Sequence, residues 1–170
     1  LMSSIALFTG SMDPFTRGHK HIVDLSLMIF DRLEIGVGIN PGKRDPLFSE
    51  SQRVDMTIQC VAEYGARVSV RAFEGVTVDL ATEIGATAII RGIRNGTDHA
   101  YEANMAFANM LMGKVEHGRA IPTVYFQCSP DLTEISSTRA RELIRLRRHK
   151  DVLRTFVQEP VISLIDGELH

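Results

Sequence analysis

The chain has 170 residues, of which 44% are hydrophobic and 24% are charged, and its formal net charge is −2. This length is typical of one domain with a proper core, and the composition is ordinary for a globular protein. The charge argues against a general nucleic-acid binder, which carries a surplus of basic residues. No apolar run approaches the roughly 20 residues of a membrane helix, and no signal-peptide pattern opens the chain. We therefore expect a soluble, cytoplasmic protein that binds neither nucleic acid nor membrane.

The chain shows no internal repeat and no linker, which predicts a single domain over residues 1–170 with a peripheral tail after about residue 156. Leu1 precedes Met2 and is interpreted as an addition to the natural sequence. Cys60 and Cys128 lie in separate apolar runs without metal-ligand or redox spacing. This pattern predicts buried free thiols and a reducing compartment.

Apolar runs and helical periodicity alternate along the chain. Strands are predicted at 4–9, 32–39, 68–73, 86–90 and 121–127. Helices are predicted at 16–30, 50–64, 76–84, 99–112, from 136–138 onward and at 151–156. Strict alternation of this kind predicts an α/β fold, a doubly wound five-stranded parallel sheet of the Rossmann-like type.

Local signals refine some of these boundaries. Ser49 and Gln52 form a capping box at the start of the second helix. Thr97 or Asp98 is expected to cap the helix after the fourth strand, and Thr77 is equally well interpreted as a helix cap or as a ligand contact. The glycines at 36 and 38 lie within a strand and are followed by Pro41, so they do not form a dinucleotide-binding turn.

Polar segments follow four of the predicted strands, at residues 11–19, 40–44, 91–94 and 132–138. Ligands of doubly wound sheets bind at the carboxyl ends of the strands, so these segments are expected to form one site. The first segment leads into a helix start, where free N–H groups and the helix dipole favour an anion. His19 lies within the first turn of that helix and can donate to a phosphate oxygen.

The residue types in these segments suit phosphoryl or nucleotidyl transfer. They offer a histidine, a lysine, arginines and hydroxyl groups, without an evident nucleophile–base pair or a metal-ligand cluster. In such transfers the acceptor phosphate is already an anionic nucleophile, and the protein supplies positioning and charge stabilisation.

Two motifs carry a resemblance to known proteins. The ordered residues Gly10, Ser11, Asp13, Pro14, Thr16, Gly18 and His19 resemble the signature of the nucleotidylyltransferase superfamily. Further segments resemble the phosphopantetheine adenylyltransferase family in particular, over essentially residues 4 to 156: Lys43 after Asn40 and Pro41, then Pro46, Phe48 and Ser49, then Arg91 to Arg94 with Tyr101 and Glu102, and finally Ile135 to Thr138.

The resemblance implies a reaction and its partners. AMP would pass from ATP to 4′-phosphopantetheine by in-line displacement, giving dephospho-coenzyme A and pyrophosphate without a covalent enzyme intermediate. Mg²⁺ would accompany ATP, with no dedicated metal ligands in the protein. The family further implies a hexamer of two stacked trimers and feedback inhibition by coenzyme A.

The resemblance also assigns residues. His19, Lys43 and Arg91 would be catalytic, and Lys43 and Arg91 would hold the phosphate of the acceptor, with Ser11 and Thr77 as further acceptor contacts. The ATP site would comprise Ser11, Met12, His19, Gly92, Ile93, Arg94, Glu102, Leu132, Thr133, Glu134, Ile135, Ser136, Ser137 and Thr138.

Some residues depart from the family pattern. Thr9-Gly10-Ser11 stands where the family usually has Pro-Gly-Thr, and Asp45 is an extra residue after Lys43, which leaves the reach of Lys43 open. Glu134, Arg139 and Arg141 are less typical, and the roles of the two arginines stay open. The residues Ser136 to Thr138 with Arg141 resemble the late motif of nicotinamide mononucleotide adenylyltransferases, which is the alternative enzyme. A non-catalytic nucleotide-binding relative is the third alternative.

Overall fold

The computed structural model describes residues 3–39 and 46–168. Its strands are β1 (Ile5–Gly10), β2 (Arg32–Ile39), β3 (Val68–Glu74), β4 (Ala88–Ile93) and β5 (Thr123–Gln127). Its helices are α1 (Arg17–Ile29), α2 (Glu50–Cys60), α3 (Thr77–Glu83), α4 (Gly96–Glu116), α5 (Ser137–Arg145), α6 (Lys150–Arg154) and α7 (Glu159–Glu168), with short 3₁₀ segments η1 (Ala62–Arg67) and η2 (Pro130–Leu132).

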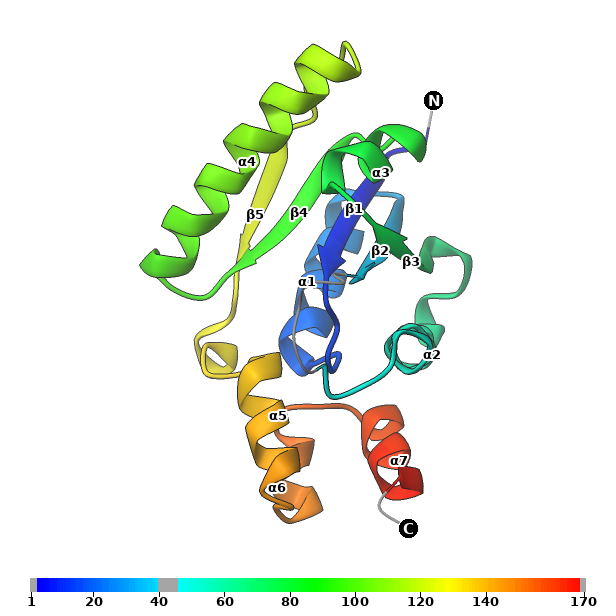
Figure 1. The fold of residues 1–170 in the computed structure, drawn as a ribbon, viewed down its shortest axis with the longest axis vertical. Coiled ribbons are helices and arrows are strands. Elements are labelled where there is room, and N and C mark those ends of the chain that lie inside the picture. The colour runs from blue at the N-terminus through cyan, green and yellow to red at the C-terminus, as the bar shows by residue number, and fades with distance from the viewer. Residues whose placement is uncertain (1–2, 40–45, 169–170) are drawn as a thin grey trace.

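The strands form one parallel sheet in the order β3-β2-β1-β4-β5 (Figure 1). Phe8 of β1 lies opposite Ile35 of β2 on one side and opposite Ile90 of β4 on the other. The chain winds outward from β1 to β3 and then returns to place β4 on the other side of β1, so the order of strands reverses at β1. The predicted doubly wound five-stranded parallel sheet is confirmed.

Alternation along the central strands divides the core between two layers of helices. Ala6 and Phe8 face a buried cluster with residues of α1, α2, α5, α6 and α7, whereas Leu7 faces a second cluster with α3 and with Ile121 and Met112. Both faces of β1 are therefore covered, as expected for a continuous apolar run in a parallel sheet. Each fully buried large apolar side chain contributes roughly 1.5–3 kcal/mol to this packing.

Gly36 shows why a glycine stands inside β2. A Cβ there would lie 3.0 Å from both the ring of Phe73 and the methyl group of Thr9, and 3.1 Å from Leu80. The glycine at this position therefore lets α3 and the edge strand pack closely on the sheet, and no dinucleotide-binding turn occurs here, as predicted.

The fourth strand and the helix after it differ from the sequence prediction. The strand predicted at 86–90 begins at Ala88 and continues to Ile93, so Arg91 lies within the sheet and not in a loop after it. The following helix begins at Gly96 and ends at Glu116, several residues beyond the predicted 99–112 at both ends. Its cap is Asn95, whose side chain accepts the N–H of Asp98, so the expected capping by Thr97 or Asp98 is wrong.

Two other boundaries also change. The helix predicted at 50–64 ends at Cys60, because the chain continues as a 3₁₀ segment in which Gly65 has a positive φ of 54°. The third helix is preceded by Val76, which makes no capping hydrogen bond, so Thr77 is the first helical residue and not the cap. Among the helix starts, the capping box at Ser49 and the start of α5 at Ser137, capped by Ser136, are confirmed.

The C-terminal segment contains a helix that the sequence analysis did not predict. Val161, Ile162 and Ile165 of α7 are buried in the same cluster as α1 and α2, so the expectation of a peripheral tail after residue 156 is wrong. The N–H of Arg17, at the start of α1, donates to the Phe156 carbonyl at 2.9 Å. The chain just before the tail is thus hydrogen-bonded to the start of α1, the helix that carries His19.

This packing predicts a measurable role for the tail. We expect Ile162→Ala to lower the free energy of unfolding by about 2–4 kcal/mol, because the substitution removes buried methyl groups and leaves a cavity. Denaturation in urea measures the change, with Val152→Ala on the exposed side of α6 as the control. An effect no larger than that of the control would contradict the assignment of α7 to the core.

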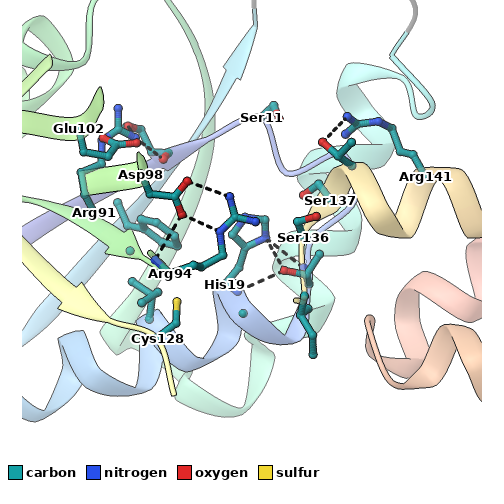
Figure 2. A pocket seen from close by; sticks show the side chains of 18 residues that line it. Ser11, His19, Arg91, Arg94, Asp98, Glu102, Cys128, Ser136, Ser137 and Arg141 are labelled. Atoms are coloured by element: carbon teal, nitrogen blue, oxygen red, sulfur yellow. Dashed lines mark hydrogen bonds and ion pairs between the residues drawn. The ribbon is translucent and has the colours of Figure 1, made fainter. Parts of the chain in front are cut away.

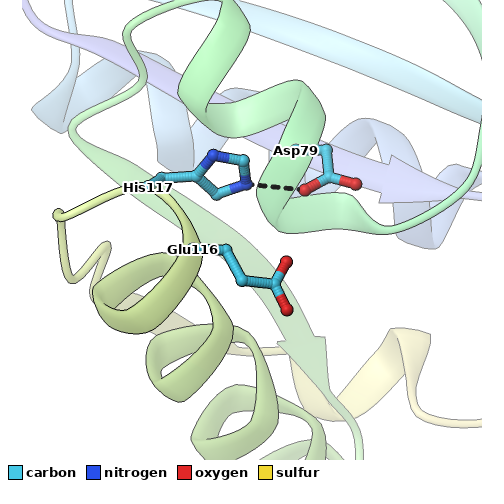
Figure 3. A group of neighbouring side chains, drawn as sticks. All are labelled: Asp79, Glu116 and His117. Carbon is cyan, nitrogen blue, oxygen red and sulfur yellow. Dashed lines mark hydrogen bonds and ion pairs between the residues drawn. The ribbon is translucent and has the colours of Figure 1, made fainter.

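The first turn of α3 and the C-terminal end of α4 meet through an exposed polar contact (Figure 3). The Nε2 atom of His117 lies 2.7 Å from Oδ1 of Asp79, and Glu116 lies beside them, with the three ligand atoms within 4.8 Å of one another. All three side chains are exposed, and the contact between His117 and Asp79 links the two helices.

No helix in the described part of the chain has both the length and the apolar character needed to span a bilayer.

Candidate active site

A pocket of about 300 Å³ opens at the carboxyl ends of β1 and β4. Its walls come from the segment after β1, the start of α1, the end of β4, the first turns of α4 and the start of α5 (Figure 2). Three of the four polar segments identified in the sequence therefore meet in one pocket. The fourth, residues 40–44 with Lys43, lies outside the described residues, as does Asp45.

His19 is fixed by the way α1 begins. Thr16 caps the helix, and its hydroxyl accepts the N–H of His19 at 3.3 Å. In return the N–H of Thr16 donates to Nδ1 of His19 at 3.0 Å. Because Nδ1 is the acceptor, the proton of the neutral imidazole resides on Nε2. The helix cap thus leaves one N–H donor on the ring of His19, a residue that lines the pocket.

Burial and the positive charge of Arg94 lower the pKa of His19 from 6.5 to about 4. The rings of Phe15 and Phe8 lie against the imidazole, with centroids 5.4 and 6.0 Å away. Burial of the ring and the nearby positive charge of Arg94 both disfavour the protonated imidazole, so near neutral pH His19 is a neutral hydrogen-bond donor.

The lowered pKa predicts a titration behaviour. We expect the imidazole of His19 in the folded protein to stay neutral until the pH approaches about 4. Between that pH and 6.5 the unfolded chain binds the proton more readily, so His19 makes the free energy of unfolding fall as the pH falls through this window. Nuclear magnetic resonance of the ¹⁵N-labelled imidazole measures the midpoint, and a midpoint near 6.5 would contradict the burial of this ring.

Two arginines reach the pocket, Arg91 within β4 and Arg94 directly after it, and each is paired with a carboxylate of α4. The Nε atom of Arg91 lies 3.0 Å from Oε2 of Glu102, and its Nη1 donates to the carbonyl of Thr9 at 3.0 Å. Arg94 makes a bidentate pair with Asp98, at 2.9 and 3.2 Å. The hydroxyl oxygens of Thr9 and Thr77 are 3.3 Å apart. Thr77 therefore lies beside the threonine that Arg91 contacts, but it does not line the pocket.

Arg141 of α5 joins the pocket from the opposite wall. Its guanidinium donates to the Asp13 carbonyl at 2.6 Å and to the Thr138 hydroxyl at 3.2 Å. The buried carboxylate of Asp13 in turn accepts the N–H groups of Leu47 and Phe48 at 3.2 and 3.0 Å. These contacts hold the first loop, the segment before α2 and the start of α5 in one arrangement.

Arg53 also holds the loop that follows β1. This residue of α2 is buried, and its Nη1 donates to the carbonyl of Ser11 at 2.9 Å and to that of Gly38 at 3.2 Å. It therefore bridges the carboxyl ends of β1 and β2, beside the pocket.

The structure brings together most of the residues predicted for the site. Those that line the pocket are Ser11, His19, Arg91, Gly92, Arg94, Glu102, Ile135, Ser136, Ser137 and Thr138. The lining does not include Met12, Ile93, Leu132, Thr133 or Glu134.

Packing explains these differences. The side chain of Met12 is fully buried in the core, which leaves only its main chain for a ligand, and Ile93 is likewise buried within β4. Glu134 is exposed and lies 3.5 Å from Arg139, so this arginine points to a surface partner while Arg141 lines the pocket.

Sequence reasoning missed several pocket residues, among them Thr9, Asp98 and Cys128, and it left the role of Arg141 open. Signals existed for two of them. Asp98 precedes Glu102 by four residues and Arg141 follows Thr138 by three, so each shares a helix face with a predicted site residue. Cys128 is a buried free thiol, as predicted, and burial raises its pKa.

The pocket also fits the expected use of Mg²⁺. The carboxylates that line its described part are those of Asp98 and Glu102, and each is already paired with an arginine. A metal ion that arrives with ATP would thus be held mainly by phosphate oxygens and water.

Comparison with known proteins agrees with this geometry. Residues 7–143 match the cytidylyltransferase-like family, so the chain is a member of this class of nucleotidyl-transferring proteins. A phosphopantetheine adenylyltransferase of Porphyromonas gingivalis is 43% identical over 148 residues, which cover 87% of this chain and 92% of the relative. One from Rhodopirellula baltica is 34% identical and covers 99% of this chain and 90% of the relative. The chain belongs to the phosphopantetheine adenylyltransferase family.

Solved structures agree on the fold. A provisionally named nicotinate-nucleotide adenylyltransferase from Vibrio parahaemolyticus superposes with a TM-score of 0.73 over 98% of this chain and 94% of its own, at 17% identity. A bifunctional nicotinamide mononucleotide adenylyltransferase from Francisella tularensis, complexed with AMP and manganese, gives a TM-score of 0.57 at 17% identity, covering 84% of this chain and 42% of its own.

Proposed function

We propose that this chain transfers AMP from ATP to 4′-phosphopantetheine, producing dephospho-coenzyme A and pyrophosphate in the synthesis of coenzyme A. The observation that carries the proposal is the convergence of His19, Arg91 and Arg94 on one pocket at the reversal of strand order. Membership in the phosphopantetheine adenylyltransferase family supports the identity of the acceptor.

The proposed reaction is a direct displacement. A phosphate oxygen of the acceptor forms a bond to the α-phosphorus of ATP while the bond from that phosphorus to pyrophosphate breaks. The neutral Nε2–H of His19 donates to the α-phosphate as negative charge builds on its oxygens. Mg²⁺ bound to the triphosphate would neutralise charge on the leaving pyrophosphate.

The residues of each pocket wall have a role in this reaction. Arg91 holds the acceptor phosphate, together with Lys43, and Thr77 lies toward the pantetheine arm. Gly92, Arg94 and Glu102 line the nucleotide side, with the main chain of Met12 and Ile93 behind them. Ile135 and the hydroxyl groups of Ser136 to Thr138 contact the adenine and phosphates, and Ser11 touches both substrates.

Nicotinamide mononucleotide is the alternative acceptor, and one observation favours it. Arg141 lines the pocket and donates to Thr138, which gives the combination of serine, threonine and arginine that resembles the late motif of those enzymes. Against it stand the 43% identity to a phosphopantetheine adenylyltransferase and the paired Arg91 and Glu102.

Production of dephospho-coenzyme A tests the proposal against a non-catalytic binding module. The purified chain, ATP, Mg²⁺ and 4′-phosphopantetheine should yield equal amounts of pyrophosphate and dephospho-coenzyme A, measured by coupled phosphate release and by mass spectrometry. Pyrophosphate should not appear without the acceptor. Binding of ATP with no product would instead support the binding module.

We also propose that the protein is a hexamer in which α4 contributes to the subunit contacts. Large apolar side chains are exposed along this helix, including Tyr101 at 65%, Phe107 at 62% and Val115 at 72%. Burial of such side chains favours association. Sedimentation velocity tests this part, since a monomer at micromolar concentration would remove it. Feedback inhibition by coenzyme A and a cytoplasmic location complete the proposal.

A further inference from the structure

Two arginine–carboxylate pairs stand side by side between β4 and α4 (Figure 2). Arg91 lies in β4 and Arg94 follows three residues later, just past the end of the strand, and their partners Glu102 and Asp98 are four residues apart on one face of the helix. All four side chains line the pocket. The positive charge that a triphosphate needs is therefore already compensated in part by carboxylates of the protein.

The two pairs are not equivalent. Arg91 has further acceptors in the carbonyl and hydroxyl oxygens of Thr9, and both side chains of its pair with Glu102 are 19% exposed. Arg94 is 35% exposed, and within the described residues the carboxylate of Asp98 is the acceptor its guanidinium contacts. Arg94 is thus the arginine that can exchange its acceptor at least cost.

We propose that Asp98 is a positioning residue that competes with phosphate for Arg94. It holds the guanidinium extended into the pocket, ready for the nucleotide. It also limits how tightly an anion binds there, because each phosphate oxygen that reaches Arg94 must displace a charged hydrogen bond. The effect of Asp98 is therefore to weaken the binding of pyrophosphate, the dianionic or more highly charged product that must leave after transfer. This inference rests on the proposed function, because it assigns pyrophosphate to the Arg94 side of the pocket.

The main-chain geometry supports a tuning role over a purely structural one. The cap of α4 is Asn95, so the helix start does not depend on the Asp98 side chain for its cap. Beyond the pair with the guanidinium, the carboxylate accepts the main-chain N–H of Arg94 at 3.3 Å. Asparagine retains one oxygen for such a bond and removes the charge, so Asp98→Asn separates shape from charge.

Calorimetric titration of the full chain with magnesium pyrophosphate provides the test. Asp98→Asn should bind pyrophosphate about five- to thirty-fold more tightly than the unmodified chain, since a charged competitor for Arg94 is lost. In steady-state assays the inhibition constant for pyrophosphate and the KM for ATP should fall, while kcat should not rise. Weaker or unchanged binding of pyrophosphate would overturn the proposal.

Two comparisons isolate the cause. Asp79→Asn changes the third residue of α3, as Asp98→Asn changes the third residue of α4, and should leave pyrophosphate binding unchanged. In an Arg94→Gln background, Asp98→Asn should no longer tighten binding. An equal gain without Arg94 would overturn the assignment to this arginine. Direct binding keeps the inference separate from the proposed function, which is tested instead by the formation of dephospho-coenzyme A by the unmodified chain.

Discussion

Replacing His19 by alanine should lower kcat by about 10²–10³ while the protein still folds. The ring presents a neutral Nε2–H in a partly buried pocket, where a fixed donor stabilises developing charge more than water does. Alanine removes this donor, and the Thr16 side chain still caps the main-chain N–H of residue 19. Steady-state release of pyrophosphate measures the loss, and circular dichroism checks the fold.

His21 offers a matched control for this change. It lies two residues further along α1 and does not line the pocket. His21→Ala should keep kcat within about twofold of the unmodified chain, because the half-buried His21 side chain contributes no group to the pocket. Near-normal turnover of His19→Ala, or an equal loss in both variants, would contradict the role of His19.

Substitution of Arg91 by methionine should affect the acceptor more than ATP. We expect kcat/KM for 4′-phosphopantetheine to fall about 10²–10³, because one charged donor to the acceptor phosphate is lost and Glu102 is left without its partner. The KM for ATP should change by a smaller factor. Full kinetics with each substrate varied in turn separate the two effects.

Arg71 provides the comparison for this variant. Like Arg91 it is a strand arginine paired with a glutamate, here Glu34 at 2.6 Å, but it lies on β3 and does not line the pocket. Arg71→Met should lower stability by leaving the buried Glu34 unpaired and should leave the acceptor KM unchanged. A shared loss of acceptor affinity in both variants would show that Arg91 acts only through the fold.

The sequence predicted the sheet well because its strands are apolar runs bounded by clear turn residues. It failed where tertiary contacts override local signals. Arg91-Gly92 looks like a loop, yet the strand continues through it, since a Cβ at position 92 would lie 3.0 Å from Ile22 and glycine lets α1 pack there. Gly96 looks like a breaker but opens α4 because Asn95 caps it.

The candidate site was predictable as far as its residues lie in recognisable motifs. His19, Arg91 and Arg94 belong to that part. Arg53 was not predictable, since an arginine in an amphipathic helix normally faces solvent, and only the fold shows that it is buried between the ends of β1 and β2. The burial of the Met12 side chain was equally hidden, because Met12 stands within the loop motif and only the fold shows its side chain in the core.

The central claim is that this pocket transfers AMP to phosphopantetheine. A competition assay tests it most directly: one reaction contains ATP, Mg²⁺ and equal concentrations of 4′-phosphopantetheine and nicotinamide mononucleotide, and mass spectrometry quantifies both products. We predict that dephospho-coenzyme A forms in at least hundredfold excess, which corresponds to about 2.7 kcal/mol of discrimination in the transition state. A preference for the nicotinamide product, or the absence of both products, would contradict the account.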